Sequence, residues 1–377
     1  MNAIYLDNAA TTRMDPEVIE VMQAAMVENF GNPSSTHQFG RKAKSSLETA
    51  RKNIAKHFNV SAAEIIFTSS GTEADNLILH NAILNLDVTR IITSKIEHHA
   101  VLHACDFLQM SENIVVEYVN VDAFGNVDIL HLEKLLKASK VKTLVSLMMI
   151  NNEIGNLLSV HEIANICKLN NALFHSDTVQ VIGHYKIDLQ TTMIDFMVAS
   201  AHKFHGPKGV GFAFFRKGFG IVPMLHGGGQ EKGARSSTEN VHAILGMEKA
   251  LDIAHNTLEE DKIHIENLKI YFITELKKIS KDFLFNGHSG DLEKSSYTIL
   301  SVRFPTQNEM LLFSLDLAGI AVSGGSACQS GSNKGSHVLS EILKDGEEDK
   351  TSIRFSFSKF TKKDDIDCTI LKLKELF

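Results

Sequence analysis

The sequence predicts an α/β protein built on a mostly parallel sheet flanked by helices, with a smaller α+β unit at its C-terminal end. Strand-length apolar runs alternate with helical stretches between residues 65 and 215. Such alternation is typical of βαβ units, whose parallel sheets are covered by helices on both faces. The alternation stops after Thr238, where a long polar helical stretch begins. This change of pattern indicates a second structural unit.

Two helices are expected before the first strand. Asp15 and Pro16 have the form of an N-cap with proline at the first helical position, and a further helix is expected over residues 40–57. The apolar and helical periodicities then alternate. The expected strands are 65–68, 90–93, 114–119, 144–150, 172–175, 196–200 and 210–215, and the helices between them are 72–86, 97–110, 128–138 and 159–170.

The C-terminal part of the sequence predicts one long helical stretch followed by shorter strands and helices. Helical periodicity covers 239–278, strands are expected near 297–304 and 352–356, and helices near 308–317 and 364–376. We therefore expect a large domain over 15–255. A small domain, formed by 1–14 and 256–377, would carry the loop around Cys328.

Composition narrows the class of protein. The chain has 377 residues and a net charge of −7, so nucleic acid is an unfavourable partner for its surface. The apolar runs are too short to cross a bilayer. The first residues lack the basic start and apolar core of a secretory signal, which predicts a cytoplasmic location. Four widely spaced cysteines without a Cys-x-x-Cys pair favour neither disulfides nor a zinc knuckle.

Two reactive residues lie in well-marked local settings. Lys203 ends Ser200-Ala201-His202-Lys203 and is followed by a Gly-Pro-x-Gly turn, while Cys328 lies among small residues. A lysine at the end of a strand is suited to form a Schiff base with an aldehyde cofactor. A cysteine in a loop of small residues is suited to act as a nucleophile. Together they indicate a reaction of an amino-acid substrate in which the cysteine thiol removes an atom from that substrate.

Polar residues follow several of the predicted strands. Ligands of parallel sheets collect beyond the carboxyl ends of the strands, so these residues are expected to share one site. They are Gly71 and Thr72, then Asp177 and Gln180, and finally Ser200, His202 and Lys203.

Each of these groups also has a plainer interpretation. Thr72 at a helix start fits a phosphate seat, or an ordinary N-cap box with Asp75. Asp177 fits a partner for a protonated ring nitrogen, or an N-cap. Arg354, alternating with apolar neighbours on a strand, fits a carboxylate clamp, or a structural ion pair.

The histidines near residue 100 raise a separate question. His99 and His103 have the spacing of two metal ligands on a helix, but the glutamate of a His-Glu-x-x-His motif and a third ligand nearby are missing. No metal site is therefore predicted. A flat histidine ring such as that of His98 is suited to stack on a flat cofactor, although these residues alone favour a surface or core histidine.

The chain resembles the cysteine desulfurases, in the class-V branch of the fold-type-I pyridoxal-phosphate enzymes. The resemblance covers essentially the whole length and depends on segments that occur in the right order. The matching segments are 5–12, 31–35, 70–76, 97–102, 151–155, 200–203, 226–231, 235–238, 325–328 and 352–356. The resemblance implies a homodimeric, fold-type-I transferase that uses pyridoxal 5'-phosphate.

The resemblance also implies a role for each site residue. Lys203 would carry the cofactor, with His98 stacked on its ring, and Cys328 would be the nucleophile that forms a persulfide. Thr238 would reach the phosphate from the other subunit. The residues implied in cofactor binding are Gly71, Thr72, His98, Asn152, Asp177, Gln180, Ser200, His202, Lys203 and Thr238, and those implied in binding the substrate carboxylate are Asn32, Asn152 and Arg354.

The implied reaction converts L-cysteine to L-alanine and leaves the sulfur on Cys328. The several small residues after Cys328 resemble the long-loop members, which supply iron–sulfur scaffold proteins and tRNA thiolation proteins. The expected partners are such protein acceptors, without nucleic acid or membrane. The alternatives are a selenocysteine lyase, a class-V aminotransferase that does not need Cys328, an accessory protein without turnover, and a zinc hydrolase built on His99 and His103.

Overall fold

The computed structural model describes residues 3–308, 310–324 and 335–377. Its centre is a sheet of seven strands in the order β2-β8-β7-β6-β5-β3-β4. β8 runs antiparallel to both of its neighbours, and the other neighbouring pairs are parallel. The strands are β2 (Ile65–Thr68), β3 (Arg90–Ser94), β4 (Val115–Val119), β5 (Thr143–Ser146), β6 (Leu173–Ser176), β7 (Phe196–Ser200) and β8 (Gly211–Phe215).

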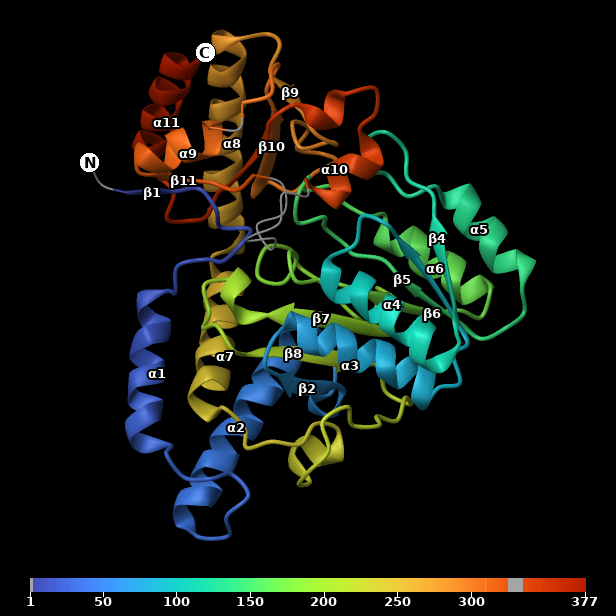
Figure 1. Cartoon of the computed structure of the whole chain (residues 1–377). Coiled ribbons are helices and arrows are strands. Elements are labelled where there is room, and N and C mark those ends of the chain that lie inside the picture. The colour runs from blue at the N-terminus through green and yellow to red at the C-terminus, as the bar shows by residue number, and fades with distance from the viewer. Residues whose placement is uncertain (1–2, 309, 325–334) are drawn as a thin grey trace.

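Alternation of side chains along the strands gives the sheet two apolar faces. Ile66 packs with α3 (Gly71–Leu84) and α4 (His99–Glu112), while its neighbours Ile65 and Phe67 belong to the core on the opposite face. Successive side chains of a strand point to opposite faces, so both faces need a layer of helices. The opposite layer contains α2 (Gln38–His57), α5 (Ile129–Ala138), α6 (Val160–Leu169) and α7 (Val241–Asn256). The predicted α/β class is confirmed (Figure 1).

A second, smaller sheet lies beyond the carboxyl ends of the main strands. β10 (Ile299–Arg303) pairs antiparallel with β12 (Ser352–Ser356) and with β9 (Leu284–Phe285). The helices α8 (Leu258–Ile279) and α11 (Lys363–Leu376) cover it, and their apolar side chains share its core. Shorter elements of this part are β1 (Ile4–Tyr5), which pairs parallel with β11 (Ile320–Ala321), and the helices α9 (Leu311–Leu317) and α10 (His337–Ile342).

Several predicted boundaries were wrong. The helical stretch predicted over 239–278 is two helices, since α7 ends at Asn256 and α8 starts at Leu258. The strand predicted over 144–150 ends at Ser146. Beyond it the backbone leaves the ladder, although Leu147 and Met149 still donate hydrogen bonds to the His175 and Asp177 carbonyls.

The N-terminal helix agrees with its sequence signals. α1 (Pro16–Glu28) has Asp15 as its N-cap, and the Asp15 side chain accepts a hydrogen bond from the Glu17 amide. A short loop connects α1 to α2, and both helices lie in the lower left part of the molecule as drawn in Figure 1. Among the described residues, none of the helices combines the length and the apolar character that a membrane span requires.

Candidate active site

One cavity of about 350 Å³ lies at the carboxyl ends of the main strands. Its volume is in the range of sites for small molecules and cofactors. It receives residues from the main sheet, from β12 and from the N-terminal segment before α1. The predicted site residues that line it are Gly71, Thr72, His98, Asn152, Asp177, Gln180, Ser200, His202, Lys203 and Arg354.

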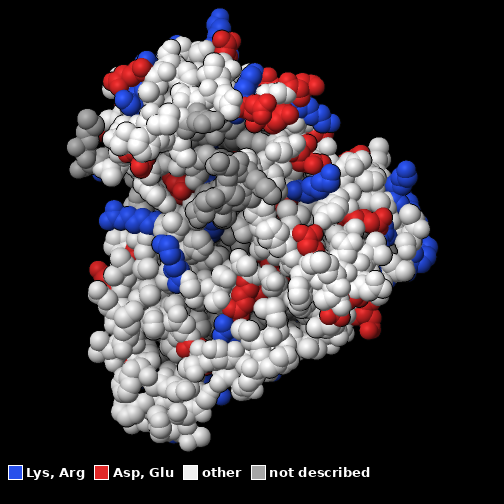
Figure 2. Space-filling view, in the orientation of Figure 1, with Lys and Arg blue, Asp and Glu red and all other residues white. Residues whose placement is uncertain are grey.

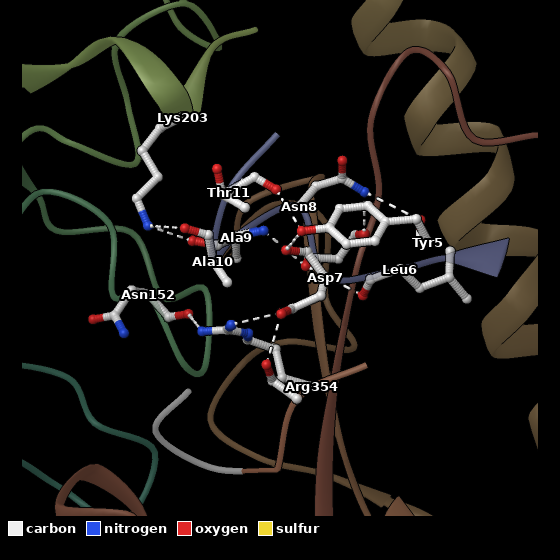
Figure 3. A network of polar contacts seen from close by, with 12 residues as sticks. Tyr5, Leu6, Asp7, Asn8, Ala9, Ala10, Thr11, Asn152, Lys203 and Arg354 are labelled. Atoms are coloured by element: carbon white, nitrogen blue, oxygen red, sulfur yellow. Dashed lines mark hydrogen bonds and ion pairs between the residues drawn. The ribbon is translucent and has the colours of Figure 1, made fainter. Parts of the chain in front are cut away.

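Lys203 reaches the cavity because the chain turns sharply after β7. Ala201 accepts a hydrogen bond from Gly206, and a Cβ on Gly206 would lie 2.8 Å from the Ala201 Cβ, so the turn requires glycine there. The Lys203 Nζ donates to the carbonyls of Ala9 and Ala10, at 2.7 and 2.9 Å (Figure 3). The N-terminal segment therefore forms the wall of the site that faces the lysine.

Two histidines of the site are neutral near pH 7. Burial, with the positive charge of Lys203 as a second cause, lowers the pKa of His98 and of His202 to about 4. The His98 Nδ1 accepts from the Ala100 amide and so caps α4. The His202 Nδ1 lies 3.1 Å from the Thr11 hydroxyl. Both rings are thus oriented by local partners.

Asp177 is a buried carboxyl at the end of β6. Burial raises its pKa, against the opposing effects of the Val179 amide and of Lys203. It caps no described helix, so the N-cap interpretation is wrong. Gln180 follows it and donates from Nε2 to the Ala9 carbonyl at 3.0 Å.

A second buried acid, which sequence reasoning did not assign to the site, also lines the cavity. The Asp75 Oδ1 lies 3.4 Å from the His175 Nε2, and the His175 Nδ1 lies 2.9 Å from the Ser146 hydroxyl. Burial raises the pKa of Asp75 well above its usual value and lowers that of His175 to about 3. His175 is therefore neutral at pH 7, and burial favours the protonated form of Asp75.

The start of α3 forms the polar end of the cavity. Ser70, not Thr72, is its N-cap and accepts from the Glu73 amide, so the N-cap box proposed for Thr72 is wrong. The Ser200 hydroxyl is buried and has no hydrogen-bond partner among the described residues. A Cβ on Gly71 would lie 2.6 Å from the Val179 Cγ2. A helix start and a buried hydroxyl without a partner are suited to hold an anion.

Arg354, on β12, also lines the cavity. It is 3% exposed, and it forms an ion pair of 2.9 Å with Asp7. The Asn152 carbonyl accepts a second bond from it at 2.7 Å, while the Asn152 amide points away from Arg354 (Figure 3).

Two described residues of the predicted site, Asn32 and Thr238, do not line this cavity. Asn32 lies in the exposed loop between α1 and α2, where its side chain accepts from the Ser34 amide. Thr238 lines a different cavity of about 220 Å³, together with Glu231 and Arg235. Cys328 lies outside the described residues.

The His99 and His103 rings stack on each other, with centroids 4.7 Å apart. Within residues 3–308, 310–324 and 335–377, no cluster of three or more His, Cys, Asp or Glu side chains could hold a metal ion.

Comparisons with known proteins agree with this architecture. Residues 4–368 match the family Aminotransferase class-V. A structure described as a NifS-like protein has a TM-score of 0.89 and 38% identity, and the match covers 99% of each chain. The family match and the shared fold therefore place the chain in the class-V aminotransferase family.

Relatives identify the branch within this class. Cysteine desulfurase IscS of Dictyoglomus turgidum is 41% identical, over 99% of this chain and 94% of that protein. A structure of SspA in complex with cysteine is 30% identical, with a TM-score of 0.78 over 95% of this chain and 100% of that one. The chain belongs to the cysteine desulfurases of the class-V aminotransferase family, which confirms the predicted family and enzyme class.

Proposed function

We propose that this enzyme removes the sulfur of L-cysteine with pyridoxal 5'-phosphate, giving L-alanine and a persulfide on Cys328. The observation that carries the proposal is the convergence of Lys203, Asp177 and Arg354 on one cavity. These side chains offer an amine, an acid and a guanidinium, the groups needed to hold an aldehyde cofactor and an amino acid together.

The residues of the cavity fit this cofactor. The Ser200 hydroxyl, which lacks a partner among the described residues, and the start of α3 would hold the phosphate, with Thr72 and His202 beside them. Asp177 would hold the ring nitrogen, and His98 would stack on the ring. Bound pyridoxal phosphate supplies an electron sink that acidifies the α-carbon of an amino acid.

Lys203 and Arg354 act on different parts of the substrate. The Lys203 Nζ moves a proton to and from the substrate α-carbon, and the nearby Ala9 and Ala10 carbonyls orient that amine. Arg354 binds the substrate carboxylate, with Asn32 and Asn152 as the further candidates. His98, neutral near pH 7, also remains able to exchange a proton.

The transfer of the substrate sulfur to the Cys328 thiol needs no additional oxidant. The Cys328 sulfur attacks the substrate sulfur, an S–S bond forms, and the substrate C–S bond breaks with its electron pair left on the carbon side. Protonation of that carbon gives L-alanine. The described residues that flank 325–334 lie at the site, because Ser323 bonds to Asp7, and His337 lines the cavity.

A homodimer and a protein acceptor complete the proposal. Exposed apolar side chains gather on α1 and the following loop and helix, namely Met26, Val27, Phe30 and Phe39. On the face that Figure 2 draws, few charged side chains lie over α1 and α2. Such a patch is suited to bind a second subunit, which would bring its Thr238 to the phosphate. Iron–sulfur scaffold or tRNA-thiolation proteins in the cytoplasm would accept the sulfur.

The direct test is to incubate the purified protein with L-cysteine and a reductant and to measure alanine and sulfide. Wild-type protein is expected to release both in equal amounts, whereas Cys328→Ser is expected to release neither. Alanine formation by Cys328→Ser at the wild-type rate would contradict the assignment. If the protein turned over selenocysteine but not cysteine, the result would favour a selenocysteine lyase. If it transaminated without releasing sulfur, the result would favour an aminotransferase.

A further inference from the structure

Arg354 is held at two of its nitrogen atoms and has a third without an acceptor. Its Nη1 donates to the Asn152 carbonyl at 2.7 Å, and its Nη2 donates to the Asp7 Oδ1 at 2.9 Å. Among the described residues, no atom accepts a hydrogen bond from the buried Nε. Since a guanidinium carries five donors in a rigid plane, fixing two nitrogens determines where the remaining donors point.

The backbone around Asp7 fixes its carboxylate in place. The Leu6 amide donates to the Ala321 carbonyl at 2.9 Å, and the Leu6 carbonyl accepts from the Ser356 amide at 2.7 Å. Asp7 therefore lies between the end of β11 and β12, the strand that carries Arg354. Figure 3 shows the carboxylate of Asp7 directed at the Arg354 guanidinium.

A second donor converges on the same carboxylate oxygen. The Ser323 hydroxyl donates to the Asp7 Oδ1 at 2.8 Å, and the Arg354 amide donates to the Ser323 carbonyl at 2.7 Å. The Asp7 side chain is 18% exposed and that of Arg354 only 3%. A charged pair with this burial and these additional bonds is more rigid than a pair at the surface.

We propose that Asp7 is a positioning residue that sets the specificity of the site for substrates with an α-carboxylate. It acts through Arg354, whose guanidinium it holds so that the unpaired donors remain available to that carboxylate. The inference rests on the proposed function, in which Arg354 binds the substrate carboxylate. It adds that the acceptor on Asp7, rather than its negative charge, is what the reaction requires.

Two substitutions separate the acceptor from the charge. Asp7→Ala removes both, and Asp7→Asn removes the charge but keeps an oxygen that accepts from Arg354. L-alanine and L-alaninamide are titrated into each holoenzyme by calorimetry, because the amide lacks the carboxylate. Asp7→Ala is expected to bind L-alanine about tenfold more weakly, since a hydrogen bond to a charged group is worth roughly that factor. Asp7→Asn is expected to stay within about threefold of wild type.

The controls locate the effect at Arg354. Affinity for L-alaninamide is expected to change less than about twofold in both variants. Ser323→Ala, which removes only the second donor to the Asp7 carboxylate, is expected to weaken L-alanine binding less than Asp7→Ala does. In an Arg354→Gln background, Asp7→Ala is expected to have no further effect on L-alanine binding. A purely structural role would weaken both ligands together and would persist in that background.

Three results would overturn the inference. They are tighter L-alanine binding by Asp7→Ala, equal effects of the alanine and asparagine substitutions, and an unchanged effect in the Arg354→Gln background. If wild type itself does not prefer L-alanine to L-alaninamide, the assigned role of Arg354 in the proposed function fails as well. A wild type that prefers L-alanine, with Asp7 variants that do not differ from it, contradicts the inference alone.

Discussion

The buried ion pair between Arg51 and Glu231 should dominate the stability of the loop that follows β8. Both Glu231 oxygens accept from the Arg51 guanidinium, at 2.6 and 2.7 Å, and one also accepts from the Phe67 amide at 2.9 Å. The two side chains are 4% and 2% exposed. The pair thus joins α2, β2 and the loop that leads to Thr238.

Glu231→Gln keeps the shape of the side chain and removes its charge. Breaking a buried pair on one side costs about 3–5 kcal/mol, because the remaining charge stays buried without compensation. Glu48 lies 3.3 Å from the Arg51 Nη2 and is 36% exposed, so it compensates only part of that charge. We therefore expect a loss of about 3 kcal/mol in the free energy of unfolding.

Urea unfolding of the holoenzyme, followed by circular dichroism, measures this loss through the transition midpoint. The control is Glu28→Gln, which removes an exposed pair with Lys42 (3.3 Å) and should cost less than about 1 kcal/mol. The double substitution Arg51→Met with Glu231→Leu should cost less than Glu231→Gln alone. A cost below about 1 kcal/mol for Glu231→Gln would refute the reasoning.

Three further predictions concern His205, Gly71 and Lys203. Burial lowers the pKa of His205 from 6.5 to about 4, so the unfolded chain binds the extra proton between these pH values. The contribution of His205 to stability should fall by about 3 kcal/mol as pH drops through this window, so the total loss should be smaller in His205→Asn by about that amount, as measured by urea unfolding at each pH. Gly71→Ala should weaken pyridoxal phosphate binding to the apoprotein about tenfold, because overpacking costs about 1–3 kcal/mol. Gly229→Ala, with no atom within 4 Å of the added Cβ, should not change that affinity in the same absorbance titration. Borohydride should fix the cofactor to wild type but not to Lys203→Ala, and mass spectrometry that finds it fixed to the variant would contradict the role of Lys203.

Helix caps and apolar periodicity in the sequence predicted those helices and strands whose bounds depend on neighbouring residues. Asp15 and Asp128 cap the helices that they were expected to start, and the strands Ile65–Thr68 and Phe196–Ser200 have the predicted bounds. The antiparallel direction of β8 was not predicted. It depends on pairing between distant strands, which periodicity along one strand does not contain.

The strand predicted over 144–150 shows why apolar runs mislead at a site. Met148 and Ile150 are buried, as residues of an interior strand would be, yet they line the cavity instead of continuing the ladder. Burial against a ligand cavity and burial in a sheet leave the same apolar pattern in a sequence.

The side chains proposed to be catalytic or to bind substrate were easier to predict than the groups that support them. Lys203, Asp177 and Arg354 were expected from their positions after or within strands, and the structure brings them to one cavity. The Ala9 and Ala10 carbonyls were missed because a backbone acceptor has no residue type that marks it. Asp7 was part of a matched segment, but its contact with Arg354 joins positions 347 residues apart.

The central claim is that sulfur passes from L-cysteine to Cys328. The most direct measurement is mass spectrometry of the Cys328 peptide after a single turnover and alkylation. The proposed function predicts one added sulfur atom on Cys328, in step with the alanine formed. Alanine formed at the full rate with the sulfur on Cys105, Cys167 or Cys368, or on no cysteine of the chain, would contradict it.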